Sequence, residues 1–169
     1  MARAAEDQGV VDPKEARRLL DAYAEAELIA LVTPEEMGLA WCRYASRAVK
    51  VEGHLDWKDD QDGWAPELYH EEEFWANEEF VRTFIVTIAD AAPDDVLGWV
   101  GAGPLEDFLT EDPDRISWAE EQAARSERFR RALANVWIDS WASDETFLRV
   151  EKAARAPLAW SNSRPRPQG

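Results

Sequence analysis

Cysteine and histidine are scarce in this sequence. Among its 169 residues there is one cysteine, Cys42, and there are two histidines, His54 and His70. A single thiol excludes an internal disulfide and a zinc site built on cysteines. The chain also lacks an apolar run of about 18 residues that could span a membrane, and acids interrupt its start, residues 1–8, where a secretory signal needs an apolar stretch. We therefore expect a soluble, cytoplasmic protein that does not contact membranes.

Basic residues are also few. The chain has 35 acidic residues against 19 basic ones, which gives a formal net charge of −16. A surface of this charge repels phosphate backbones and anionic lipids, so we predict no direct binding to nucleic acid. The same field attracts basic proteins and speeds their encounter, although acidity can also serve solubility alone. The 15 arginines, 4 lysines and many alanines are typical of a GC-rich bacterial genome.

Strand patterns are almost absent, and helix signals recur along the chain. The capping box Thr33-Pro34-Glu35-Glu36 predicts a helix over about 34–52. Apolar residues at i, i+3 and i+4 after Asn77 favour another helix, although the β-branched run 84–88 permits a strand. Proline and serine caps predict further helices at about 13–32, after Pro66, after Pro93, after Pro104, at 113–125, from Ser126 to Trp141, and from Ser143.

These helices are joined by short turns, which predicts an all-α fold. We expect a compact array of about seven helices packed as antiparallel hairpins, with an irregular α-solenoid as an alternative arrangement. Nine tryptophans, six phenylalanines and three tyrosines supply a core for one domain over residues 1–160. Residues 161–169 are polar and rich in proline, and they predict a disordered tail.

The segment from 52 to 79 concentrates negative charge and aromatic rings. It holds eleven acids and one lysine, so its 28 residues carry −10 of the total charge of −16. Carboxylates steer a basic partner and aromatic rings supply desolvated anchors, so this density predicts a protein-binding surface. Alternatively, Trp64, Phe74 and Trp75 belong to the core and attach a solvated loop at about 53–66. The candidate partner-binding residues here are Asp56, Trp57, Asp59, Asp60, Asp62, Trp64, Glu71, Glu72 and Trp75.

Patterns for metal binding and catalysis are incomplete. A calcium-loop template beginning at Lys58 has lysine at its first ligand position and Tyr69 at its twelfth, so two carboxylates are missing. The run His70-Glu71-Glu72-Glu73-Phe74 begins like a zinc-peptidase helix, but it has phenylalanine in place of the second histidine. Cys42 has no neighbouring histidine to activate it. We therefore predict no metal, no cofactor and no catalytic residue.

A glycine-rich corner carries a family resemblance. The string Val100-Gly101-Ala102-Gly103-Pro104-Leu105-Glu106-Asp107-Phe108-Leu109, with Arg128–Leu133 and Val136-Trp137, resembles a bacterial family of unknown function over about Phe74–Val150. The resemblance implies a helical domain and no activity, and it leaves the acidic segment mostly outside. Glycines at this corner let two helices meet closely, and acids suit the first turn of the next helix. Alternatively, the corner presents Glu106 and Asp107 to a partner.

The combined signals favour a binding protein over an enzyme. We hypothesise a non-enzymatic bacterial domain whose acidic aromatic surface binds a basic protein. In its sharpest form it is an immunity or antitoxin-type inhibitor whose carboxylates occupy the phosphate-binding groove of a nuclease-like toxin. The alternative is a helical scaffold or regulatory adaptor that is acidic only for solubility and works through the 101–107 corner, and a carboxylate-based enzyme ranks last. The sequence does not set the oligomeric state.

Overall fold

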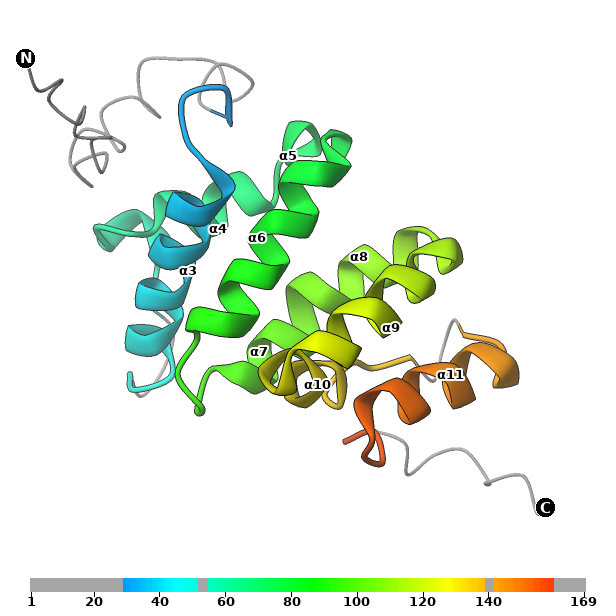
Figure 1. Cartoon of the computed structure of the whole chain (residues 1–169). Helices are drawn as coiled ribbons and strands as arrows, with labels where there is room; N and C mark the ends of the chain where they lie inside the picture. Colours follow the sequence, from blue (N-terminus) through cyan, green and yellow to red (C-terminus); the bar gives the residue numbers. More distant parts are fainter. Residues whose placement is uncertain (1–28, 52–54, 139–141, 160–169) are drawn as a thin grey trace, which may run out of the picture.

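The computed structural model describes residues 29–51, 55–138 and 142–159, and over these ranges it contains helices and turns without a β-strand (Figure 1). The all-α prediction is confirmed. Most of the helix expected at 13–32 lies outside the described residues, as do His54, Trp141 and the tail at 161–169.

Two long helices form one side of the molecule. The helix α3 (Pro34–Ala48) begins at the predicted capping box, in which the Thr33 hydroxyl accepts from the Glu36 amide at 3.2 Å and the Glu36 carboxylate accepts from the Thr33 amide at 3.1 Å. The helix α6 (Glu78–Ala91) begins at Asn77, whose side chain accepts from the Phe80 amide. It includes residues 84–88, so the strand alternative is wrong. Figure 1 shows α3 and α6 packed side by side.

The acidic segment connects these two helices through short elements. They are the 3₁₀ turn η1 (Trp57–Asp59), α4 (Trp64–Tyr69) and α5 (Glu72–Ala76). The predicted loop at 53–66 is therefore partly helical, since α4 begins inside it.

The remaining elements form the other side of the molecule. They are α7 (Leu97–Val100), the π-helical turn η2 (Gly101–Leu105), α8 (Glu106–Glu111), the 3₁₀ turn η3 (Pro113–Arg115), α9 (Ile116–Arg125), α10 (Glu127–Leu133) and α11 (Asp144–Ala154). Ser126 and Ser143 cap α10 and α11 as predicted. The prediction that the helix after Ser126 continues to Trp141 is wrong, because α10 ends at Leu133. The side-chain amide of Asn135 donates to the Arg131 carbonyl, which satisfies one of the last carbonyls of the helix.

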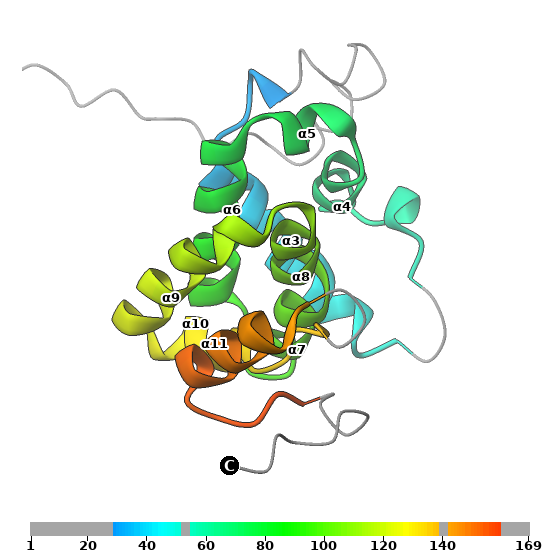
Figure 2. The same ribbon diagram turned by 90° about the vertical axis from the view of Figure 1, so that its right-hand side faces the viewer.

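One hydrophobic cluster unites both sides among the described residues. The helix α10 contacts α6, α7, α9 and α11, so it lies at the centre of the packing (Figure 2). The largest fully buried side chains include Phe74, Phe84, Phe108 and Phe129, which come from four different helices. None of the helices described here is both long and apolar enough to cross a membrane.

The glycine-rich corner is a close helix contact. The Glu106 amide donates to the Gly101 carbonyl five residues earlier, and the backbone leaves helical geometry at Ala102 and Gly103. A Cβ added at Gly101 would lie 2.2 Å from the carbonyl oxygen of Ala132 in α10. Only glycine allows this approach, so the predicted structural role of the corner is confirmed at residue 101.

Replacing Gly101 with alanine therefore forces α7 and α10 apart. We expect Gly101→Ala to lower the free energy of unfolding by roughly 2–3 kcal/mol, because the obstructing atom belongs to the backbone. Gly98→Ala is the control, since its Cβ would meet nothing closer than 3.7 Å. We expect this variant to be neutral or up to about 1 kcal/mol more stable, as alanine favours a helix. Urea denaturation measures both, and equal stabilities of the two variants would contradict the close contact.

Candidate functional site

Two carboxylates of the acidic segment point inward and bind arginines of α3. Arg43 donates to Asp62 from Nε at 3.1 Å and from Nη2 at 2.7 Å. Arg47 donates to both oxygens of Asp60, at 2.8 and 2.5 Å, and to the second oxygen of Asp62 at 2.6 Å. The Asp62 side chain is fully buried, and that of Asp60 is 8% exposed. The prediction of a solvated loop is therefore wrong for these two residues.

The ion pairs keep Asp60 charged. Burial alone would raise the pKa of Asp60, but hydrogen bonds from the Arg47 side chain and the Asp62 amide, together with the charge of Arg47, lower it below its ordinary value. The same hydrogen bond to Asp60 raises the pKa of Arg47. Near neutral pH the Asp60–Arg47 pair is thus ionised, and together with Asp62 and Arg43 it attaches the segment after η1 to α3.

The aromatic residues of the segment divide between core and surface. Trp64 and Phe74 are buried, so the alternative that they belong to the core is confirmed for both. Tyr69 is also buried, and its ring contacts those of Phe74 and Trp75 edge-on with centroids 5.7 and 5.3 Å apart. Trp57 and Trp75 are only half-buried. Trp75 also packs against the core, so the core alternative holds for it in part.

Other acids of the segment remain on the surface. Asp56 and Asp59 beside η1 are exposed, as are Glu72 and Glu73 at the start of α5, while Glu71 is half-buried. The Asp56 side chain accepts from the Lys58 amide at 3.0 Å and caps η1. With Glu79 in α6, five described carboxylates of the segment are thus exposed, fewer than the sequence suggests.

The glycine-rich corner touches the acidic segment. The hydroxyl of Tyr69 in α4 donates to Oδ2 of Asp107 in α8. Glu106 turns the other way, and its carboxylate accepts from the Trp137 amide at 2.8 Å. Burial raises the pKa of Glu106, with a further contribution from the charge of Asp107, against the opposing effect of the Trp137 hydrogen bond. The two candidate surfaces of the sequence analysis therefore meet at the Tyr69–Asp107 contact.

An open aromatic cleft lies at this junction. It has a volume of about 530 Å³ and is bounded by α3, η1, α4, α7, η2 and α8. Its polar groups include the Asp107 carboxylate and the His70 imidazole. The cleft is lined by Trp41, Tyr44, Ala45, Trp57, Pro66, Tyr69, His70, Trp99, Ala102, Gly103, Pro104 and Asp107.

Trp99 is the most exposed aromatic residue of the cleft that the sequence analysis did not select as a candidate, and buried or partly buried rings such as Trp41, Tyr44 and Tyr69 were not selected either. Trp99 lies in α7 and is 48% exposed, which is unusual for so large an apolar side chain. A tryptophan two residues before Gly101 is the only local signal for it, because a four-residue helix is too short to show which side faces the core. Trp57, in contrast, was predicted, and its ring lies 5.7 Å from that of His70.

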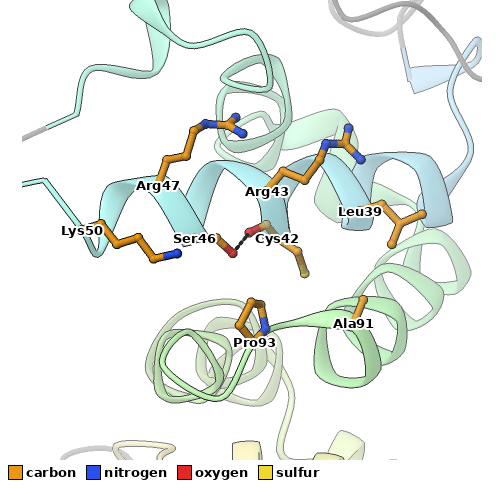
Figure 3. A pocket seen from close by; sticks show the side chains of 8 residues that line it. All are labelled: Leu39, Cys42, Arg43, Ser46, Arg47, Lys50, Ala91 and Pro93. Atoms are coloured by element: carbon orange, nitrogen blue, oxygen red, sulfur yellow. Dashed lines mark hydrogen bonds between the residues drawn. The ribbon is translucent and has the colours of Figure 1, made fainter.

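A second cavity has the opposite character. It measures about 350 Å³ and lies where α3 faces the loop after α6, with Arg43, Arg47 and Lys50 among its lining residues (Figure 3). Figure 3 shows the two arginines extending away from Pro93, toward the acidic segment that they bind. Cys42 also lines it, but burial raises the pKa of its thiol to about 12. That thiol stays protonated at neutral pH, and Cys42 is buried.

The described residues contain no group of three or more histidine, cysteine or acidic side chains that could hold a metal ion. Asp60 and Asp62, which fall on the calcium-loop template, are occupied by arginines instead. His70 is exposed beside Trp57 and Tyr69 and has aromatic neighbours. The groups that line the cleft are aromatic faces, the His70 imidazole and the Asp107 carboxylate.

Comparison with known proteins places the chain in a family. Residues 53–158 match a family of unknown function (DUF6869), and the protein belongs to this family. The match covers more than half of the chain and begins at residue 53, so the acidic segment lies inside the family domain. The expectation that this segment lies mostly outside is corrected. No curated protein matches, and no solved structure does.

The buried ion pairs predict that replacing Asp62 lowers the free energy of unfolding much more than replacing Asp59 does. We expect Asp62→Asn to lower the free energy of unfolding by roughly 1–3 kcal/mol, because Arg43 and Arg47 each lose a charged acceptor while keeping some contact with water. Asp59→Asn is the matched control, since Asp59 is exposed. We expect it to change the free energy of unfolding by less than about 0.5 kcal/mol. Urea denaturation at pH 7 decides, and equal effects would rule out an anchoring role for Asp62.

The raised pKa of Glu106 predicts a specific pH dependence. A carboxyl whose pKa is higher in the folded state contributes stability below its ordinary value of 4.5, and this contribution is lost as pH rises through the raised value. The stability of Glu106→Gln relative to the wild type should therefore be greater at pH 7 than at pH 4. The amide oxygen of glutamine can still accept from the Trp137 amide. Glu111→Gln, exposed at the end of the same helix, should show a constant difference in chemical denaturation at both pH values.

Proposed function

We propose that this protein is a non-enzymatic, cytoplasmic bacterial protein-binding domain that binds a basic partner through the face around η1, α4 and α5. The observation that carries the proposal is the open aromatic cleft beside Asp107, with exposed carboxylates on the adjoining elements. Half-buried and exposed tryptophans at positions 57 and 99 are suitable anchors, since tryptophan contributes strongly to the energy of protein interfaces.

Charge supports the choice of a basic partner. The chain carries a net charge of −16. Asp60 and Asp62 are already paired with arginines, so the negative field that a partner meets at this face comes from the exposed acids. Asp56 and Asp59 lie on either side of Trp57 in the sequence, so charge and an anchor occur together. Such a field increases association rates with a basic protein by about 10- to 1,000-fold.

The sharpest form of the proposal is an immunity or antitoxin-type inhibitor. In this role the exposed carboxylates would occupy the phosphate-binding groove of a nuclease-like toxin and exclude its nucleic acid by charge and by volume. The mechanism needs no cofactor, because both effects come from the bound surface itself.

A helical scaffold or adaptor is the second candidate, and the corner supports it. Pro104 and Asp107 line the cleft, so a partner could bind at the corner without using the acids around η1 and α5. In that case the negative charge would serve solubility, and association would depend little on salt.

Neutralising the exposed acids separates the two candidates. The bait is the full chain, and a partner identified by affinity capture is then purified for rate measurements at low and high salt. We expect the combined variant Asp56→Asn, Asp59→Asn, Glu72→Gln and Glu73→Gln to slow association by about tenfold or more at low salt, with little change in the dissociation rate.

The control changes the same number of charges elsewhere in the fold. Its substitutions are Asp95→Asn, Glu121→Gln, Glu127→Gln and Glu145→Gln, all at exposed positions. If the acids around η1 and α5 alone steer the partner, the control variant associates at nearly the wild-type rate. If both variants bind at the wild-type rate and Asp107→Asn abolishes binding, the adaptor candidate is correct.

A further inference from the structure

The aromatic cleft has one charged acceptor without a cation. Oδ2 of Asp107 accepts from Tyr69, while Oδ1 makes no hydrogen bond within the described part of the chain, and Asp107 is exposed. Among the described residues that line the cleft, His70 is the only basic one. Trp57 of η1 and Trp99 of α7 also line the cleft. Rings and a carboxylate thus surround a space that no described arginine or lysine enters.

Elsewhere in the fold the same chemical groups hold arginines. The Arg82 guanidinium lies 5.6 Å from the centre of the Trp118 ring and pairs with Glu78 at 2.5 Å. The Arg115 guanidinium lies 4.2 Å from the centre of the Phe108 ring and also reaches Glu78, at 3.4 Å. Both sites combine an aromatic face with a carboxylate, because a planar guanidinium can stack on a ring and donate from its edge.

We propose that the cleft between α3, η1, α4 and the 101–107 corner binds the guanidinium side chain of an arginine from the partner. The inference rests on the proposed function and names the group that is recognised. The guanidinium stacks against Trp57 or Trp99 and donates to Oδ1 of Asp107. A volume of about 530 Å³ accommodates a long side chain with part of its backbone.

Arginine fits these groups better than lysine does. An ammonium is a compact, strongly hydrated charge, and it loses more hydration on entering a cleft whose walls are mostly aromatic and aliphatic. Arginine keeps donors at the edge of its plane for the carboxylate while the face contacts the ring. The cleft is therefore expected to distinguish the two cations.

The test uses Nα-acetyl-arginine amide as the probe and the full chain as the receptor. The indole N–H resonances of Trp57 and Trp99, assigned by substitution, report binding during the titration. We expect saturable shifts at both resonances. Nα-acetyl-citrulline amide has nearly the same shape without the charge, and Nα-acetyl-lysine amide has the charge without the plane, so both should bind at least about threefold more weakly. Equal binding of the three probes, or no saturable shift with the arginine probe, overturns the inference.

Matched variants locate the site. Asp107→Asn and Trp99→Ala should each weaken binding of the arginine probe by about three- to tenfold, which corresponds to the loss of an exposed charge pair or cation–π contact. The asparagine still offers an oxygen to the Tyr69 hydroxyl, so the corner can keep its fold. The controls are Asp95→Asn and Trp137→Ala, because Asp95 is exposed outside the cleft and Trp137 is 51% exposed. Equal losses in the variants and the controls contradict the assignment.

The experiments distinguish a failure of the arginine site from a failure of the proposed function. If the four-acid variant slows association with the purified partner while Asp107→Asn and Trp99→Ala leave its affinity unchanged, the domain binds a basic protein without an arginine in the cleft. If the arginine probe binds and both cleft variants weaken it, but the four-acid variant associates at the wild-type rate, the cleft inference stands and the steering face is wrong.

Discussion

The candidate site depends on the buried contact between Asp62 and the two arginines of α3. Asp62 is the only charged side chain among the buried residues of the described chain. Its burial would be unfavourable without Arg43 and Arg47, since an unpaired charge in the interior is strongly destabilising. With these partners it holds the end of η1 and the start of α4 against α3, and so fixes where Trp57, Tyr69 and His70 stand. A segment rich in acids is thereby attached to the core through its charges as well as through its rings.

The beginnings of helices were predictable, and several of their ends were not. Thr33, Asn77, Ser126 and Ser143 each cap a helix through a hydrogen bond to an amide three residues later, so the signal lies within four residues of sequence. The end of α10 at Leu133 has no such local signal, because the apolar residues Val136 and Ile138 remain buried after the helix stops. An apolar pattern that continues past a helix end predicts a longer helix.

For the site, the sequence indicated which residues gather but not which way they face. Charge and aromatic density indicated the segment around Trp57, but Asp62 and Trp64 of that segment are buried. The glycines indicated a helix contact at the 101–107 corner, which the structure has at Gly101. Asp59 and Asp62 look alike in the sequence, yet one faces solvent and the other lies inside, because the arginines that select Asp62 belong to a helix 15 or more residues earlier. The contact between Tyr69 and Asp107, which joins segment and corner, spans 38 positions. Such pairings depend on the packing of whole helices.

The π-helical turn at Gly101–Leu105 sets the angular phase of α8. A π turn contains one residue more than an α-helical turn of the same span, and each added residue rotates the rest of the helix by about 100° around the axis. With this extra residue, Asp107 faces α4 and Glu106 faces the chain after α10. Removing one residue before α8 would turn the helix by about 100°, so Asp107 would take the direction of Glu106, and Phe108 would take that of Asp107. The amino acids of α8 therefore do not by themselves determine which of them line the cleft. A related chain with the same acids but a shorter turn would present a different surface.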